Sequence, residues 1–205
     1  MSTNPDLDIP PIYFIRHGET DWNRQGLIQG TIETDINENG VAQAISVARA
    51  LAVKQPELQA YDFVVSPQLR AQHTMRIICD LQPRDFNSVR TDSRVRELGF
   101  GVWEGHPMWE LKDSPIYPAD AQGHFDWRPE GGESYADGMQ RVDGFLRELT
   151  RPTLIVAHGG VGRCIIGYVC NLPGPEIAHL PTPQGCYCVL EDHAYRWVDA
   201  ESLPT

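Results

Sequence analysis

The sequence predicts an α/β sandwich with a mainly parallel sheet. Short apolar segments that read as strands alternate with segments of helical periodicity, which is typical of a parallel sheet covered by helices. The chain has 205 residues, 41% of them hydrophobic, which is enough to bury one large core and short for two domains. We therefore expect one compact domain.

The N-terminal half predicts two strand–helix units. The apolar segment 12–16 (IYFIR) reads as a strand, and apolar residues at helical spacing after Gly40 predict a helix of about three turns. A second strand is expected over residues 61–65 (YDFVV). It is closed by Ser66-Pro67, and because proline suits the first turn of a helix, we expect a helix from there through residue 81.

The C-terminal half predicts two more helices and three strands. Apolar residues at helical spacing indicate a helix over 133–149, which is followed by a strand over 153–157 (TLIVA). A further helix is expected from Gly159 through residue 169. Two closing strands are expected over 186–190 and 195–198.

The N-terminus indicates a cytoplasmic protein. Residues 1–11 are polar and contain proline, so we expect a loose lead-in before a domain of residues 12–205. They lack both the basic start and the apolar stretch of a secretory signal. The longest apolar runs are too short to cross a bilayer, so we expect no membrane contact.

Charge and cysteine content restrict the classes of ligand. The formal net charge of -11 repels polyanions, which argues against nucleic-acid binding and means that a phosphate substrate needs a local cluster of positive charge. The five cysteines form neither a CxxC pair nor a zinc-binding spacing, so we expect reduced, mostly buried thiols and no metal site. The sequence does not indicate an oligomeric state.

Polar side chains follow three of the expected strands. These segments are Arg16-His17-Gly18, Ser66 to Arg70, and His158-Gly159. In parallel sheets, ligands bind at the carboxyl ends of strands, where loops and side chains converge. We therefore expect these segments to form one site.

The residues around His17 favour phosphoryl transfer. A histidine at a strand end is more often structural than nucleophilic, but here Arg16 precedes it and Gly18 frees the backbone beside it. An imidazole attacks phosphorus only when neutral, and a neighbouring guanidinium lowers its pKa. The same guanidinium would neutralise phosphoryl oxygens.

Three further residues have both a structural and a catalytic interpretation. His158 is either a polar residue that ends a strand or a ligand of the phosphoryl group. Arg70 lies at the start of a helix, where positive charge is disfavoured unless a bound anion shares the site. Glu97 is either an exposed carboxylate or the proton donor that the leaving oxygen of a phosphate ester requires.

Several ordered motifs resemble those of the histidine phosphatase superfamily, the phosphoglycerate mutase-like enzymes. They are FIRHGETDWN, Gln29-Gly30, SPQLRAQHT, ELGFGVWEG, GGES at 131–134 and VAHGG, and they extend from about residue 12 to residue 170. The resemblance implies a single-domain, three-layer α/β/α sandwich with a mixed, mostly parallel sheet. It implies no metal and no other cofactor. Shortly after Gln29-Gly30 the family often has Asp-x-Pro-Leu, where this chain has Glu33-Thr34-Asp35-Ile36.

The resemblance also implies a role for each matching residue. His17 would be the phosphorylated nucleophile and Glu97 the general acid. Residues implied to bind the phosphoryl group or border the substrate pocket are Arg16, Asn23, Gln29, Gly30, Arg70, His158 and Gly159.

The resemblance leaves three functions open: a phosphatase acting on a small phosphorylated substrate, a cofactor-dependent phosphoglycerate mutase, and a non-catalytic phosphate-binding protein. The third is disfavoured because every implied catalytic residue is present. Residues 106–130, the expected substrate-capping segment, contain only Lys112 and Arg128 as full cations against five carboxylates, which favours the phosphatase. The segment's aromatic residues either pack it onto the core or contact the leaving group; they are Trp109, Tyr117, Phe125 and Trp127.

Overall fold

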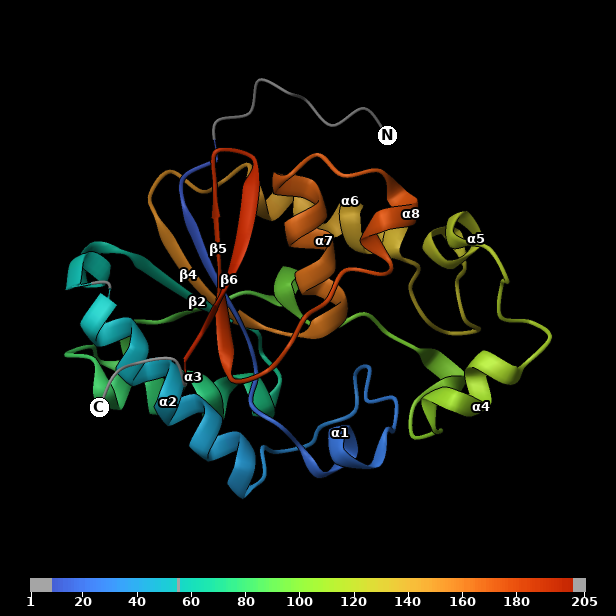
Figure 1. Ribbon diagram of the computed structural model, residues 1–205, viewed down its shortest axis with the longest axis horizontal. Helices are drawn as coiled ribbons and strands as arrows, with labels where there is room; N and C mark the ends of the chain where they lie inside the picture. The colour runs from blue at the N-terminus through green and yellow to red at the C-terminus, as the bar shows by residue number, and fades with distance from the viewer. Residues whose placement is uncertain (1–8, 55, 201–205) are drawn as a thin grey trace.

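A computed structural model describes residues 9–54 and 56–200. Most of the expected lead-in, residues 1–8, lies outside the described residues, as do the last five residues of the expected domain. Figure 1 shows a central sheet with helices on both sides.

The described residues form a six-stranded sheet in the order β3-β2-β4-β1-β5-β6. The first four strands in this order are parallel, and β5 and β6 add to the β1 edge as an antiparallel pair. The mixed, mostly parallel sheet expected from the sequence is confirmed. The strands are β1 (Ile12–Arg16), β2 (Asp62–Val65), β3 (Arg90–Thr91), β4 (Thr153–Ala157), β5 (Cys186–Glu191) and β6 (Ala194–Asp199).

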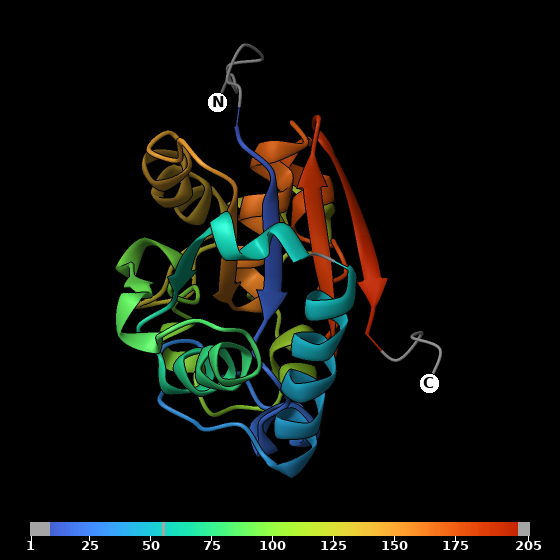
Figure 2. The same ribbon diagram turned by 90° about the vertical axis from the view of Figure 1, so that its left-hand side faces the viewer.

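Both faces of the sheet are buried, which produces the three layers. Successive side chains of a strand point to opposite faces. In β1, Ile12 and Phe14 pack into the core beneath α6 (Tyr135–Leu146) and α7 (Gly159–Val169), whereas Tyr13 and Ile15 pack into the core beneath α2 (Glu38–Lys54) and α3 (Leu69–Leu81). Figure 2 shows α2 and α3 on the near side of the sheet and α7 behind it.

The long helices differ from the predictions mainly at their ends. Helix α2 has 17 residues, longer than the three turns expected. Helix α3 begins at Leu69 with Gln68 as its N-cap, so the proline before them lies outside the first turn. Helix α6 begins after a capping box, in which the Ser134 hydroxyl accepts from the Asp137 amide while the Asp137 carboxylate accepts from the Ser134 amide.

Elements of only one or two turns have no pattern in the sequence long enough to predict them. The short α-helices are α1 (Asp21–Gln25), α4 (Met108–Asp113), α5 (Ala121–Asp126) and α8 (Gly174–Ile177). The 3-10 helices span Pro56–Ala60, Phe86–Ser88, Ser93–Val95 and Gly101–Trp103.

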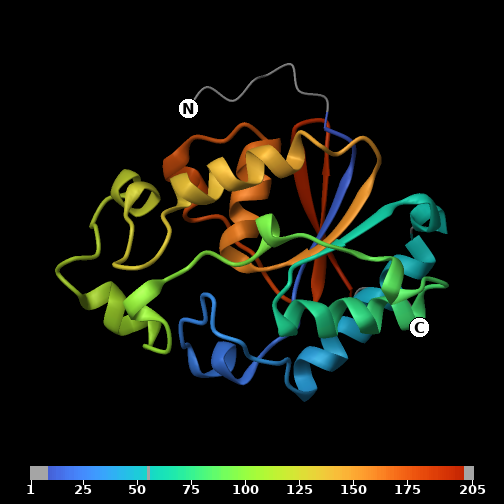
Figure 3. The same ribbon diagram turned by 180° about the vertical axis from the view of Figure 1, so that it is seen from behind.

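The segment 106–130 contains α4 and α5, which project beyond α6 and α8 on one side of the molecule (Figures 1 and 3). It is attached to the body through the Met108 amide, which donates to the Gly26 carbonyl at 2.9 Å, and through the buried side chain of Leu111. Arg128 forms an ion pair with Asp137 of α6. Lys112, the other full cation of this segment, lines a cavity that is described below.

The remaining general expectations concern thiols and membranes. All five cysteines are free and all except Cys170 are buried, as expected. Across residues 9–54 and 56–200, no helix combines the length and apolar character needed to cross a bilayer.

Candidate active site

The carboxyl ends of β1, β4 and β2 bring three separate segments together. The main chain of His17 donates to Ala157 at 2.9 Å, and that of Ser66 donates to Val156 at 3.1 Å. The strand order therefore places His158 between His17 and Ser66. The imidazole rings of His17 and His158 lie 5.1 Å apart between centroids. The expectation that these strand ends meet at one edge is confirmed.

His17 is held as a neutral imidazole with one nitrogen available. Its Nδ1 lies 2.8 Å from the Gly18 carbonyl, so Nδ1 carries the proton and Nε2 carries the lone pair. Burial lowers the pKa of His17 well below 6.5, and the charges of Arg16 and Arg70 lower it further. The ring is only 2% exposed. The neutral imidazole is the state that nucleophilic attack on phosphorus requires.

Gly18 is required by a close approach of two chain segments. A Cβ atom at this position would lie 2.4 Å from the carbonyl oxygen of Gly40 at the start of α2. The glycine therefore allows the loop after β1 to pass against α2, and this contact fixes the direction in which the chain leaves His17.

Backbone carbonyls orient the two predicted arginines. Arg16 donates from Nη1 to the Thr182 carbonyl at 2.8 Å, and its buried Nε has no partner within the described residues. Arg70 is 1% exposed and donates from Nη1 to Ile32 and from Nη2 to Gly30, both at 2.9 Å. An unpartnered buried donor is costly, so the Arg16 Nε fits a site that an anion occupies.

His158 orients Arg70 in this structure. Its Nδ1 accepts a hydrogen bond from the Arg70 Nε at 3.1 Å, so its proton is on Nε2, which donates to the Ser66 hydroxyl at 2.6 Å. Burial lowers the pKa of His158 well below 6.5, and the charge of Arg70 adds to the effect. Both ring nitrogens thus have partners, and direct contact of His158 with a phosphoryl group remains a prediction.

Glu97 lies against the N-terminus of α7. Its carboxylate accepts hydrogen bonds from the main chain of Gly160 at 3.0 Å and of Val161 at 2.9 Å, and from its own neighbour Leu98 at 2.9 Å. A Cβ atom on Gly160 would lie 2.7 Å from the Glu97 Oε1, so the glycine permits this approach. Helix N-termini attract anions, and a phosphoryl group entering the site would compete with the Glu97 carboxylate for these amides.

The amide side chains of Asn23 and Gln29 have occupied oxygens. The Asn23 Oδ1 accepts from the Gln184 Nε2 at 3.1 Å and from the Thr20 amide at 3.2 Å. The Gln29 Oε1 accepts from the hydroxyls of Thr20 at 3.1 Å and Thr34 at 2.6 Å. Each therefore offers its NH₂ group, a hydrogen-bond donor, to a ligand.

Two connected cavities lie at this edge of the fold. The smaller, of about 240 Å³, is lined by all of the sequence-predicted site residues except His158: Arg16, His17, Asn23, Gln29, Gly30, Arg70, Glu97 and Gly159. The larger, of about 570 Å³, lies beneath the capping segment. The two share the lining residues Phe100, Met108, Tyr135 and Arg163.

The structure divides the aromatic residues of the capping segment into those that line a cavity and those that do not. Tyr117 and Trp127 line the larger cavity and pack edge to face at 5.2 Å. Phe125 packs instead on Gly174 of α8, and Trp109 is 65% exposed. Only the first two are therefore placed to contact a leaving group.

Sequence reasoning did not single out two residues that lie at this site, Arg163 and Gln68. Arg163 was detectable, because it lies four residues after Gly159 on the expected helix and therefore on the same face. Gln68 lies within the noted segment but has no pattern of its own: it donates from Nε2 to the Gly30 carbonyl at 2.9 Å and accepts from the Glu97 amide at 2.8 Å. It thereby connects the loop that carries the acceptors of Arg70 to the backbone of Glu97.

The loop that departs from the family motif supports α3. The Glu33 carboxylate accepts from the Leu69 amide at 2.8 Å and so satisfies the first amide of the helix. Asp35 contacts His73 of α3 at 2.8 Å. The helix N-terminus that lines the smaller cavity is that of α7, through Gly159 and Gly160, whereas α3 contributes only Arg70 to the lining.

Comparison with known proteins agrees with this geometry. Residues 12–201 match the model of the histidine phosphatase superfamily (branch 1). The chain belongs to this family. It is a phosphatase of the superfamily, and its α/β fold is that of the family's solved structures.

The relatives include phosphatases of small phosphate esters and also a probable phosphoglycerate mutase of an Enterobacter species, which is 32% identical over 170 residues and covers 79% of this chain and 75% of the relative. The chain is 31% identical over 176 residues to a glucosyl-3-phosphoglycerate phosphatase of Mycobacterium tuberculosis, covering 79% of this chain and 76% of the relative. It is 30% identical over 191 residues to an adenosylcobalamin/α-ribazole phosphatase of Escherichia coli, covering 88% and 89%. A solved mycobacterial glucosyl-3-phosphoglycerate phosphatase in complex with VO3 superposes with a TM-score of 0.74 at 27% identity, covering 92% of this chain and 96% of that one.

Proposed function

We propose that this phosphatase hydrolyses a small phosphomonoester through a phosphohistidine on His17. The observation that carries the proposal is the buried, neutral imidazole of His17, whose Nε2 lone pair lies in a cavity also lined by Arg16 and Arg70. A neutral nucleophile beside two guanidinium groups can attack a phosphate ester while the positive charge stabilises the phosphoryl oxygens.

The first step forms a bond from the His17 Nε2 to phosphorus and breaks the bond from phosphorus to the ester oxygen. Glu97, in its protonated form, gives a proton to that oxygen as the alcohol leaves. The donors for the phosphoryl oxygens are the Nε of Arg16, the guanidinium of Arg70, the NH₂ groups of Asn23 and Gln29, and the first amides of α7.

The second step releases inorganic phosphate. The Glu97 carboxylate accepts a proton from a water molecule whose oxygen attacks phosphorus, and the bond to Nε2 breaks, which restores neutral His17 and protonated Glu97. Gln68 holds the Glu97 backbone and the Gly30 loop together, so the acid stays in register with Arg70 through both steps.

The larger cavity offers space for the leaving group of the ester. Its volume of about 570 Å³ exceeds what a phosphoryl group needs, and Tyr117 and Trp127 offer apolar surface there. By analogy with the relatives, glucosyl-3-phosphoglycerate and α-ribazole phosphate are candidate substrates for a panel read out by release of inorganic phosphate.

The covalent intermediate tests the mechanism. The enzyme is quenched during turnover under non-acidic conditions and its peptides are examined by mass spectrometry. We expect one added phosphoryl group on the peptide that contains His17, and no adduct or turnover in His17→Ala. His73→Ala, on the solvent side of α3, is the matched control and keeps both. Labelling of His158 with full activity in His17→Ala would refute the assignment.

A further inference from the structure

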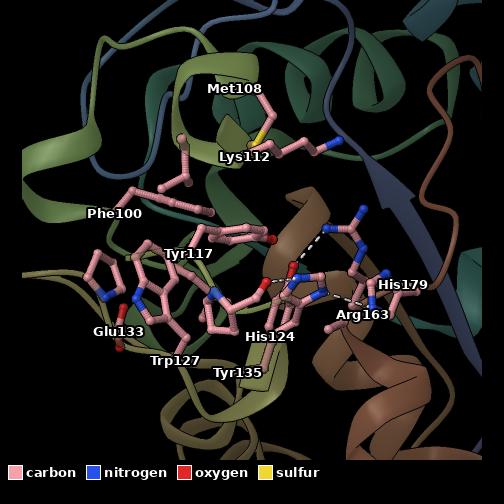
Figure 4. Close-up of a pocket in the computed structure, with 15 residues that line it drawn as sticks. Phe100, Met108, Lys112, Tyr117, His124, Trp127, Glu133, Tyr135, Arg163 and His179 are labelled. Carbon is pink, nitrogen blue, oxygen red and sulfur yellow. Dashed lines mark hydrogen bonds between the residues drawn. The ribbon is translucent and has the colours of Figure 1, made fainter. Parts of the chain in front are cut away.

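Arg163 lies where the two cavities meet, and it lines both. Two neutral acceptors fix its guanidinium: Nε donates to the Leu180 carbonyl and Nη1 donates to the Tyr135 hydroxyl, both at 2.7 Å. In Figure 4, Arg163 and His179 are on the right of the larger cavity, whereas Phe100 and Trp127 are on the left. The guanidinium is therefore placed between the phosphoryl site and the space for the leaving group.

The charges around Arg163 leave it without a carboxylate of its own. Among the described residues, no ion pair includes Arg163. Glu97 is the only acid that lines the smaller cavity there, and it acts electrostatically on all three arginines of that cavity. Glu133, the acid of the larger cavity, is paired with Arg96 and Arg141 at 3.1 Å each.

A phosphate ester alone does not neutralise this site. When Glu97 is protonated to act as the acid, the smaller cavity holds three guanidinium groups and a phosphoryl dianion balances two of them. A partly desolvated cation without a partner is costly, and Arg binds carboxylates through well-oriented, charge-assisted hydrogen bonds. Lys112 adds a further cation to the larger cavity.

The Tyr135 hydroxyl supplies a second donor beside Arg163. Its oxygen accepts from the Arg163 Nη1, so its own proton is available to a ligand that enters either cavity. Burial raises the pKa of Tyr135 to about 12, and the hydroxyl therefore keeps this proton at neutral pH.

We propose that Arg163 and Tyr135 bind a carboxylate in the leaving group, so that the preferred substrate is the phosphate ester of a hydroxy acid. The rest of the leaving group then extends over Tyr117 and Trp127. This inference rests on the proposed function, because it assigns the substrate class of the same site. A merely structural Arg163 would tie α7 to Tyr135 and treat acidic and neutral substrates alike.

A matched pair of substrates tests the proposal. 3-Phosphoglycerate and glycerol 3-phosphate differ only by a carboxylate in place of a hydroxymethyl group. We expect the wild-type kcat/KM to be about 10–100-fold higher for 3-phosphoglycerate, the range for hydrogen bonds to a charged group. In Arg163→Met this ratio falls to near 1, and in Tyr135→Phe it falls part of the way. Arg49→Met, which removes one exposed arginine of α2 outside the cavities, keeps the wild-type ratio.

Each protein serves as its own folding control, since hydrolysis of glycerol 3-phosphate by the same sample reports an intact site. A wild-type ratio near 1, or equal losses on both substrates in Arg163→Met, would overturn the inference and leave the phosphatase mechanism standing. Failure to hydrolyse these two esters and every ester of the substrate panel would instead reject the proposed function. In that case calorimetry of the binding of both compounds to His17→Ala still tests carboxylate recognition. Equal affinities for the two compounds refute it. A preference for 3-phosphoglycerate that is lost in His17→Ala/Arg163→Met supports it.

Discussion

The two buried histidines should make the folded state sensitive to mild acid. Burial and the neighbouring arginines keep His17 and His158 neutral in the fold, whereas in the unfolded chain each takes up a proton near pH 6.5. Below that pH the unfolded state binds more protons, so the free energy of unfolding falls as pH falls. The stabilising contribution of neutral His17 and His158 is present above pH 6.5 and is lost below it.

The magnitude follows from proton linkage. Each histidine lowers the free energy of unfolding with a slope that approaches about 1.4 kcal/mol per pH unit, which amounts to about 2 kcal/mol at pH 5. The pair therefore removes at most about 4 kcal/mol between pH 7 and pH 5, a limit set by the pKa of the unfolded histidines. Asp92 and Glu148 also have depressed pKa values. Their effect on the free energy of unfolding appears at lower pH, where the carboxylates of the unfolded chain take up protons. The window from pH 6.5 to pH 5 thus isolates the histidines.

Urea unfolding at several pH values between 7 and 5 measures how steeply the free energy of unfolding falls with pH. The measurement is made on the wild type, His17→Gln and His158→Gln. Each variant should reduce the limiting slope by about 1.4 kcal/mol per pH unit, whatever its stability at pH 7. His106→Gln, at a half-exposed position, is the control and should keep the wild-type slope. A slope that persists in both His17→Gln and His158→Gln would refute the claim that these rings are neutral in the fold.

Two further predictions concern the reaction. Glu97→Gln should slow hydrolysis of an alkyl phosphate by about 10²–10⁴-fold and of an activated aryl phosphate much less, as measured by phosphate release, because only the poor leaving group needs a proton; equal losses would indicate a positioning role. 3-Phosphoglycerate should not be isomerised to 2-phosphoglycerate at a useful rate even with 2,3-bisphosphoglycerate, and EDTA should not change phosphate release. Arg128 is engaged by Asp137, so too few cations remain for a second phosphate as well as a carboxylate; efficient isomerisation with little phosphate release would instead identify a mutase.

Long periodic elements and strand ends could be predicted from the sequence, whereas elements of one or two turns could not. The strand over 12–16 and the strand over 153–157 have the observed bounds, because a short apolar run between polar residues specifies a buried strand. Helix α5 could not be predicted: its six residues are held by the Asp120 cap and by contact with α8, neither of which leaves a periodic pattern. Tertiary contacts, rather than local propensity, determine such elements.

In the candidate site too, some features could be predicted from the sequence and others could not. His17 and Arg70 were found because they lie at a strand end and a helix start, and Glu97 because it lies in the ELGFGVWEG motif; the smaller cavity brings the three together. The orientation of Arg70 was not predictable, since its acceptors are the backbone carbonyls of Gly30 and Ile32 and a carbonyl has no sequence signature. Sequence patterns specify which side chains are present, but the loops that hold them are defined only by the fold.

The way the arginines are held explains how a chain of net charge -11 can bind a phosphate ester. Several arginines elsewhere are paired with carboxylates; Arg94, for example, pairs with Asp92 and Glu148. The arginines of the smaller cavity are held instead by neutral acceptors, namely the carbonyls of Thr182, Ile32, Gly30 and Leu180, the Tyr135 hydroxyl and the His158 ring. A neutral acceptor fixes a guanidinium without cancelling its charge. The positive potential therefore remains available to the substrate.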